Sequence, residues 1–168
     1  GEYGADAARM YEMFMGPFED GQPWDTKGVV GVYRFLNRVW NFVSDFQEPK
    51  KVNEQAERVI NKHIKEIGDD VENMKFNTGV SGLMKLMNEI EDKWLTRKQY
   101  ETFLKLLAPF APHIAEELWH QLATSDKPSK ASLATGGRQA TSIHLEKWPE
   151  YDETLLAEET VKLVVQVN

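Results

Sequence analysis

The stretch KGVVGVYRFLNRVWNFVSDF, residues 27–46, constrains the fold more than any other part of the sequence. At about 100° per residue, its large apolar side chains fall in one continuous arc, which is wide enough to pack on a core of other helices. The members of this arc are Val32, Tyr33, Phe35, Leu36, Val39, Trp40, Phe42, Val43 and Phe46. We therefore predict a long helix that ends before Pro49 and whose start is capped by Asp25 or Thr26.

The opposite face of this helix is basic and polar, although the chain has a formal net charge of −7. It carries Lys27, Arg34, Asn37, Arg38 and Asn41, which we call the basic face, and no acid. From the spacing alone, a solvated surface and a surface for a phosphate backbone are equally good explanations. The planar fork of arginine matches two phosphate oxygens, and asparagine reaches sugars and base edges, so these residue types suit the second explanation.

Apolar residues recur at helical spacing in five further segments. These are residues 3–15, 52–71, 75–94, 98–107 and 112–122. In the third segment the spacing places Trp94 on the core side, and the small residues Gly79 and Gly82 leave room for another backbone to come close. Because Pro109 cannot continue a helix and Pro112 suits a first turn, we predict a corner between the last two segments. The fold class is therefore all-α, a bundle of about five to six helices.

The last part of the chain has a different composition. Residues 123–142 are polar and rich in glycine and serine, which predicts a loop without a core of its own. The final residues, TVKLVVQVN, alternate and are β-branched, which predicts a strand. Because a single strand is not stable, we expect this β segment to be truncated and the chain to belong to something larger.

The sequence shows no catalytic constellation and no metal site. There is no cysteine, and no apolar run is long enough to span a bilayer, so we expect a cytoplasmic, non-membrane protein. The simplest interpretation of the four histidines is that each is structural or solvent-exposed. No two of them lie one helical turn apart, as a pair of zinc ligands on one helix would. The histidines are His63, His113, His120 and His144.

Six stretches, taken in order, closely resemble the part of bacterial-type leucyl-tRNA synthetases that follows the catalytic core. They are YGADAAR, FMGPFED, WDTKGVxGxYRFLNRVW, FNTGxSxLMxLxN, LLAPFAPHIAEELW and SIHxxxWPxYD. The fifth is shared by the class I synthetases for leucine, isoleucine and valine, whereas the second, followed by RFLNRVW, favours leucine. The resemblance covers essentially the whole chain.

In that family the region is a helical bundle called the anticodon-binding domain. The resemblance implies four parts: the end of a stem-contact segment (1–16), the helical bundle (17–122), a polar loop (123–142), and a closing segment that leads into a small C-terminal appended domain (143–168). The family's catalytic motifs, HIGH and KMSKS, are absent.

The resemblance also implies a function. The parent enzyme is expected to join leucine to its tRNA, using ATP and Mg²⁺ that this part of the chain does not itself bind. The partners are then tRNA, with leucine isoacceptors preferred, and the catalytic and editing domains of the same chain, in a monomer. The basic face and Asn77 are the expected tRNA-binding residues, through the tRNA backbone rather than the anticodon bases.

Two alternatives remain open at this point. The chain could be the same domain of an isoleucyl- or valyl-tRNA synthetase. It could instead be a helical protein-interaction module whose basic face meets an acidic partner. Salt-sensitive binding of tRNA separates the RNA-binding alternatives from the protein-binding one.

Overall fold

The computed structural model describes residues 2–17, 19–21, 23–47, 49, 51–124 and 141–156. The helices within these ranges are α1 (Gly4–Phe14), α2 (Thr26–Ser44), α3 (Glu54–Glu72), α4 (Phe76–Ile90), α5 (Arg97–Leu107), α6 (Pro112–Thr124) and α7 (Glu153–Leu156), with a 3₁₀ turn, η2 (Ile143–Leu145). The described ranges contain no strand, and the predicted all-α class is confirmed. The predicted strand lies outside the described residues, as do residues 125–140 of the predicted loop.

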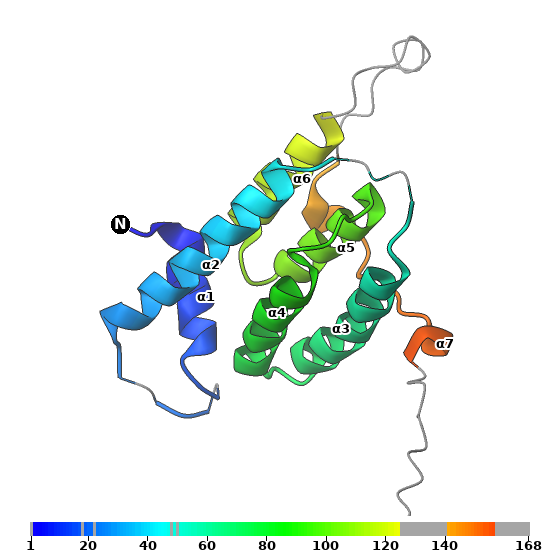
Figure 1. Cartoon of the computed structure of the whole chain (residues 1–168). Helices are drawn as coiled ribbons and strands as arrows, with labels where there is room; N and C mark the ends of the chain where they lie inside the picture. Colours follow the sequence, from blue (N-terminus) through cyan, green and yellow to red (C-terminus); the bar gives the residue numbers. More distant parts are fainter. Residues whose placement is uncertain are drawn as a thin grey trace, which may run out of the picture.

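The helices form a bundle with α4 near its middle (Figure 1). α3 and α4 run antiparallel and share the most extensive contact of any pair, while α4 also packs against α1. α2 lies across α1 and along α6, and α5 packs against both α3 and α6. The core is therefore enclosed by helices from the whole described chain, which fixes the direction in which α2 presents its outer face.

The apolar arc of α2 packs into the core as predicted. Val32, Phe35, Val39 and Val43 are each at most 2% exposed. The helix begins at the predicted cap, because the Asp25 carboxylate accepts a hydrogen bond from the Lys27 backbone N–H at 2.9 Å. Burying one face of a 19-residue helix leaves the opposite face in solvent.

Three aromatic residues that the periodicity places in the core are exposed instead. Tyr33 and Trp40 lie at the edges of the α2 arc and are 38% and 37% exposed. Trp94 is 65% exposed, because α4 ends at Ile90 and the turn that follows leaves the helical path. The helical spacing predicts the buried side of α4 correctly as far as the end of that helix, but a pattern of spacing does not show where a helix stops.

The corner predicted between the last two long helices is present, since α5 ends at Leu107 and α6 begins at Pro112. Phe110 fills this corner and is fully buried. A Cβ added at Gly79 would lie 2.9 Å from the Phe110 ring, and one added at Gly82 would lie 3.0 Å from the side chain of Ile67. The small residues of α4 therefore admit side chains, not the neighbouring backbone that the sequence suggested.

Candidate nucleic-acid interface

The basic face is solvent-exposed over its whole length. Lys27, Arg34, Asn37, Arg38 and Asn41 are all exposed and recur at helical spacing on one side of α2. About 16 Å of helix axis separates Lys27 from Arg38, at about 1.5 Å per residue. The face is therefore a rigid row of donors whose spacing is set by the helix.

The cations of the basic face differ in their surroundings. The side chains of Lys27 and Arg34 contact no acid in the part of the chain that the structure describes. Arg38, by contrast, donates to the Glu91 carboxylate at 2.5 Å and to the Asn88 amide oxygen at 2.8 Å, both beside the end of α4. Glu91 therefore neutralises part of the charge of Arg38. The sequence does not reveal this pairing, because Glu91 lies 53 residues away along the chain.

The three asparagines lie in different surroundings. Asn37 lines a cavity of about 260 Å³ together with Tyr3, Tyr33 and His113, whereas Asn41, one turn further along, lines a larger one at the C-terminal end of α2. Asn77 lies in the first turn of α4, at the opposite end of that helix from the residues that hold Arg38. The structure thus brings five of the six predicted residues onto one helix face, and Asn77 is not one of them.

The larger cavity is an open groove of about 920 Å³ between the end of α2, the end of α4 and the start of α5. Its lining comprises Arg38, Asn41, Phe42, Ser44, Asp45, Phe46, Gln47, Met87, Glu91, Asp92, Lys93, Trp94 and Tyr100. Burial, with a smaller contribution from the Asp45 charge, raises the pKa of Tyr100 to about 12, so its hydroxyl stays protonated. The groove continues the basic face, because Arg38 and Asn41 belong to both.

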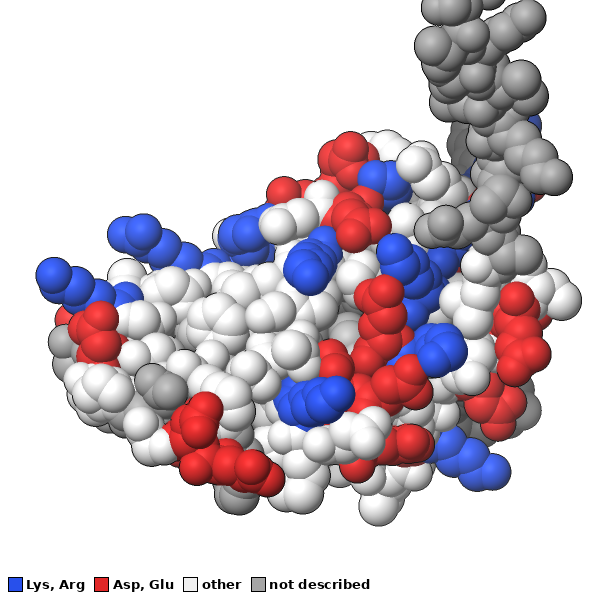
Figure 2. Space-filling model, turned by 90° about the horizontal axis from the view of Figure 1, so that it is seen from below, with Lys and Arg blue, Asp and Glu red and all other residues white. Residues whose placement is uncertain are grey.

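Charge is unevenly distributed over the surface. On the face in Figure 2, acidic and basic side chains alternate over the right half, while on the left basic side chains project at the upper edge, a broad uncharged area lies in the middle and acidic side chains lie along the lower edge. The left half lies on the side of α1 and the start of α2 in Figure 1. An acidic chain can therefore present cations locally, since salt screens charges beyond about 10 Å.

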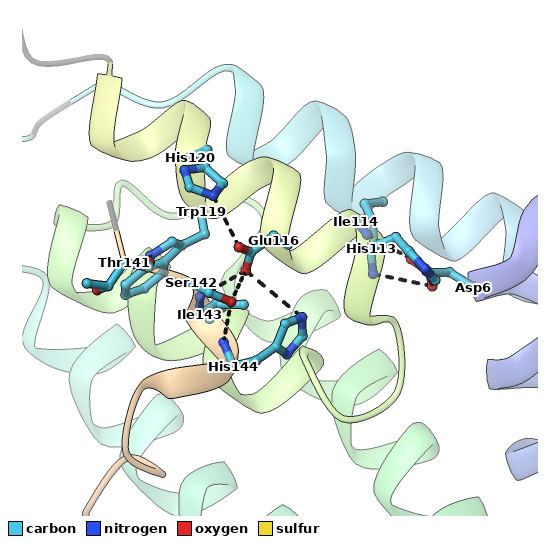
Figure 3. A network of polar contacts seen from close by, with 10 residues as sticks. All are labelled: Asp6, His113, Ile114, Glu116, Trp119, His120, Thr141, Ser142, Ile143 and His144. Carbon is cyan, nitrogen blue, oxygen red and sulfur yellow. Dashed lines mark hydrogen bonds and ion pairs between the residues drawn. The ribbon is translucent and has the colours of Figure 1, made fainter. Parts of the chain in front are cut away.

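A buried carboxylate joins α1 to α6. Asp6, which is 9% exposed, accepts a hydrogen bond from the Ile114 backbone N–H at 2.7 Å and contacts the His113 Nδ1 at 2.7 Å (Figure 3). It thus caps the first turn of α6 from 108 residues away. Arg9 adds a hydrogen bond to the Pro109 carbonyl at 3.1 Å. The DAAR and APFAPHI stretches are therefore in contact, and this contact sets the angle between α1 and α6.

A second carboxylate ties α6 to residues 141–156, which we call the C-terminal strap. Glu116 accepts hydrogen bonds from the Ile143 backbone N–H at 2.9 Å and from the Ser142 hydroxyl at 3.1 Å (Figure 3). Although burial acts to raise the pKa of Glu116, these bonds and one to His120 hold it below its ordinary value. Two bonds of 2.7 Å between the Asn61 side chain and the Asp152 backbone fix the far end of the strap to α3.

The histidines serve this architecture. His63 is 2% exposed between Glu66 and Glu89, 3.4 and 3.3 Å from their carboxylate oxygens, whereas the other three are exposed.

In the described part of the chain, no three His, Asp or Glu side chains form a group that could hold a metal ion. No described helix is both long and apolar enough to cross a membrane.

The family model for the anticodon-binding domain of tRNA ligases matches residues 53–168, which is more than half of the chain. The chain belongs to this family. The chain also matches curated leucine–tRNA ligases over 99% of its length. It is 43% identical to that of Herpetosiphon aurantiacus over 178 residues, 40% to that of Borreliella afzelii over 174 and 41% to that of Chloroherpeton thalassium over 174. The predicted resemblance to leucyl-tRNA synthetases is confirmed.

The chain spans only 20%, 18% and 20% of the length of these three relatives. A solved structure with a similar fold is the ternary complex of the agnB2 LeuRS of Agrobacterium radiobacter K84 with tRNA and LeuAMS. The TM-score is 0.71 and the identity 25%, and the match covers 94% of this chain and 21% of that one. The bundle therefore corresponds to one part of a much longer enzyme.

Proposed function

We propose that this domain holds tRNA against the basic face of α2 as part of a leucine–tRNA ligase. The observation that carries the proposal is the pair Lys27 and Arg34, two exposed cations without an acidic partner among the described residues. They lie on one turn-to-turn row with Asn37 and Asn41, in a domain that is otherwise acidic. The solved relative with this fold was crystallised with tRNA, which supports the same kind of partner here.

The roles of the side chains follow from their chemistry. Lys27 and Arg34 neutralise phosphates, Asn37 and Asn41 donate to sugars or backbone oxygens, and Arg38 contributes less charge because Glu91 competes for it. Asn77, on α4, is a secondary contact in the same proposal. We assign no catalytic residue to this domain, whose task is to position tRNA.

The parent enzyme, in this proposal, attaches leucine to its tRNA with ATP and Mg²⁺, as a cytoplasmic monomer. The sequence lacks the HIGH and KMSKS motifs that the resemblance associates with the ATP-dependent step. That chemistry belongs to catalytic and editing domains elsewhere in the parent. Within this chain we assign residues 1–16 to the stem-contact segment, 17–122 to the bundle, 123–142 to the loop and 143–168 to the appended domain's approach.

The test is a fluorescence titration of the 168-residue chain with labelled leucine tRNA and an unrelated tRNA, at about 50 and about 200 mM salt. Two neutralised phosphates give a slope of about −1.6 in log K against log salt, so the fourfold rise in salt lowers affinity about tenfold. Arg34→Glu should reduce the slope by about 1 and weaken binding more than Arg38→Glu does.

The matched control is Arg58→Glu, which makes the same change of charge at an exposed position of α3. If Arg58→Glu weakens binding as much as Arg34→Glu, the interaction depends on net charge and not on the basic face. If the wild-type chain binds neither tRNA at the lower salt concentration, the proposal is wrong and tRNA is held elsewhere in the parent.

A further inference from the structure

The groove at the end of α2 contains an aromatic side chain that the fold leaves unused. Trp94 is 65% exposed and takes part in none of the aromatic pairs among the described residues. The other rings of the groove are already engaged: Tyr100 lies 4.8 Å from Phe42 and 5.3 Å from Phe46, centroid to centroid. The groove therefore has one rigid aromatic wall and one free, exposed indole.

The charges of the groove are paired within it. Arg38 is bound to Glu91 at 2.5 Å, and the ammonium of Lys93 contacts the Asp92 carboxylate at 2.9 Å. With Asp45, the lining has three acids and two bases. Among the described lining residues a phosphate would meet this excess of acid and no unpaired cation, so this part of the groove does not suit a phosphate.

An uncharged ring with hydrogen-bonding edges suits it better. Nucleobases stack on exposed aromatic side chains whatever their sequence, and their N–H groups donate to carboxylates such as Asp45. The amides of Asn41 and Gln47 offer both donors and acceptors at the same place. The volume of about 920 Å³ exceeds what one base needs and lies within the range of about 300–1,000 Å³ of small-molecule sites.

We propose that this groove receives an unpaired nucleobase of the bound tRNA, stacked on Trp94, while the flanking phosphates lie along the basic face. The proposal rests on the proposed tRNA-binding function and deepens it. The link between the two is structural, because Arg38 and Asn41 line the groove and also lie on the basic face. The basic face then supplies salt-dependent affinity, and the groove supplies a contact that requires an unpaired base and is largely independent of salt.

The experiment compares Trp94→Ala with the wild-type 168-residue chain in binding a leucine tRNA transcript that carries 2-aminopurine at unpaired loop positions. Loss of one base–aromatic stack corresponds to roughly 5- to 150-fold weaker binding. We expect that loss without a change in the salt slope, together with loss of the 2-aminopurine fluorescence change at one loop position. Trp94→Phe should restore most of the affinity, and a fully paired RNA duplex should bind the wild type and Trp94→Ala equally.

Leu145→Ala is the control, because Leu145 is 79% exposed and does not line the groove. The proposal is overturned if Trp94→Ala binds the transcript as Leu145→Ala does, or if the duplex is affected as much as the transcript. The first result, with wild-type binding still salt-sensitive and still weakened by Arg34→Glu, would leave the proposed function standing and assign the groove to a protein segment. If the wild type does not bind the transcript, both proposals fail together.

Discussion

Removing the carboxylate of Asp6 should destabilise the whole bundle, although Asp6 lies in the first helix and acts on the sixth. Asp6→Ala leaves the Ile114 N–H without its partner at 2.7 Å and removes the contact with the His113 ring at 2.7 Å. Loss of a helix cap costs about 1 kcal/mol, and a hydrogen bond to a charged group adds about 1.5–3 kcal/mol. Because Asp6 is buried, water replaces it poorly at the Ile114 N–H, whereas the exposed His113 ring can be hydrated, and we expect a loss of about 3 kcal/mol.

The assay is urea unfolding followed by far-UV circular dichroism, with thermal unfolding as a second measurement. For a domain of this size, a loss of about 3 kcal/mol lowers Tm by about 6–12 °C. Asp6→Asn, which retains one acceptor oxygen, should lose about half as much free energy. Glu12→Gln is the control, because Glu12 is an exposed acid of the same helix and its change should stay within about 0.5 kcal/mol. A loss for Asp6→Ala no larger than that of the control would refute the assignment of Asp6 as the cap of α6.

Four further substitutions follow from the packing, the backbone conformation and the direction of a pKa shift. Gly79→Ala should destabilise by about 1–3 kcal/mol, because its Cβ meets the buried Phe110 ring at 2.9 Å, whereas Gly31→Ala, in open space on α2, should stabilise by about 1 kcal/mol in the same urea assay. Met74→Gly should stabilise by about 1 kcal/mol, since Met74 holds φ at 56°, and unchanged stability would contradict this. The lowered pKa of Glu116 contributes stability above its ordinary value of 4.5 that is lost as pH falls through the lower folded value, so the difference in unfolding free energy between wild type and Glu116→Gln should shrink over that acid range.

The long helices could be predicted because their causes are local. The arc of α2, the Asp25 cap and the Pro109–Pro112 corner each depend on residues within one or two turns, and the structure contains all three. The wrong prediction for Trp94 has a different cause. Its spacing is that of a core residue, but the chain leaves the helix after Ile90, and nothing in a periodic pattern shows where packing ends a helix.

The sequence also predicts which residues form the basic face, but it does not show which of their charges are paired with acids. The exposure of Lys27 and Arg34 follows from the helical period, but the partner of Arg38 comes from α4. The groove combines residues from α2, the end of α4 and α5, and only the folded chain brings them together. A contact between residues 53 positions apart has no local signal in a single sequence, which is why the partner of Arg38 could not be predicted.

Two carboxylates, one buried and one half-buried, connect stretches of the resemblance that lie far apart in the chain. Asp6 joins DAAR to the start of α6, and Glu116 of the same helix holds the SIH segment of the strap, so three distant stretches meet on α6. α2 packs along α6 and across α1, so the same contacts that fix α6 also orient the basic face. Most of the stretches that carry the resemblance therefore build the bundle. One of them forms α2, whose basic face the bundle holds toward solvent. In the proposed function, a row of phosphates is recognised by the spacing of its partners, so a rigid support is as necessary to the basic face as its cations are.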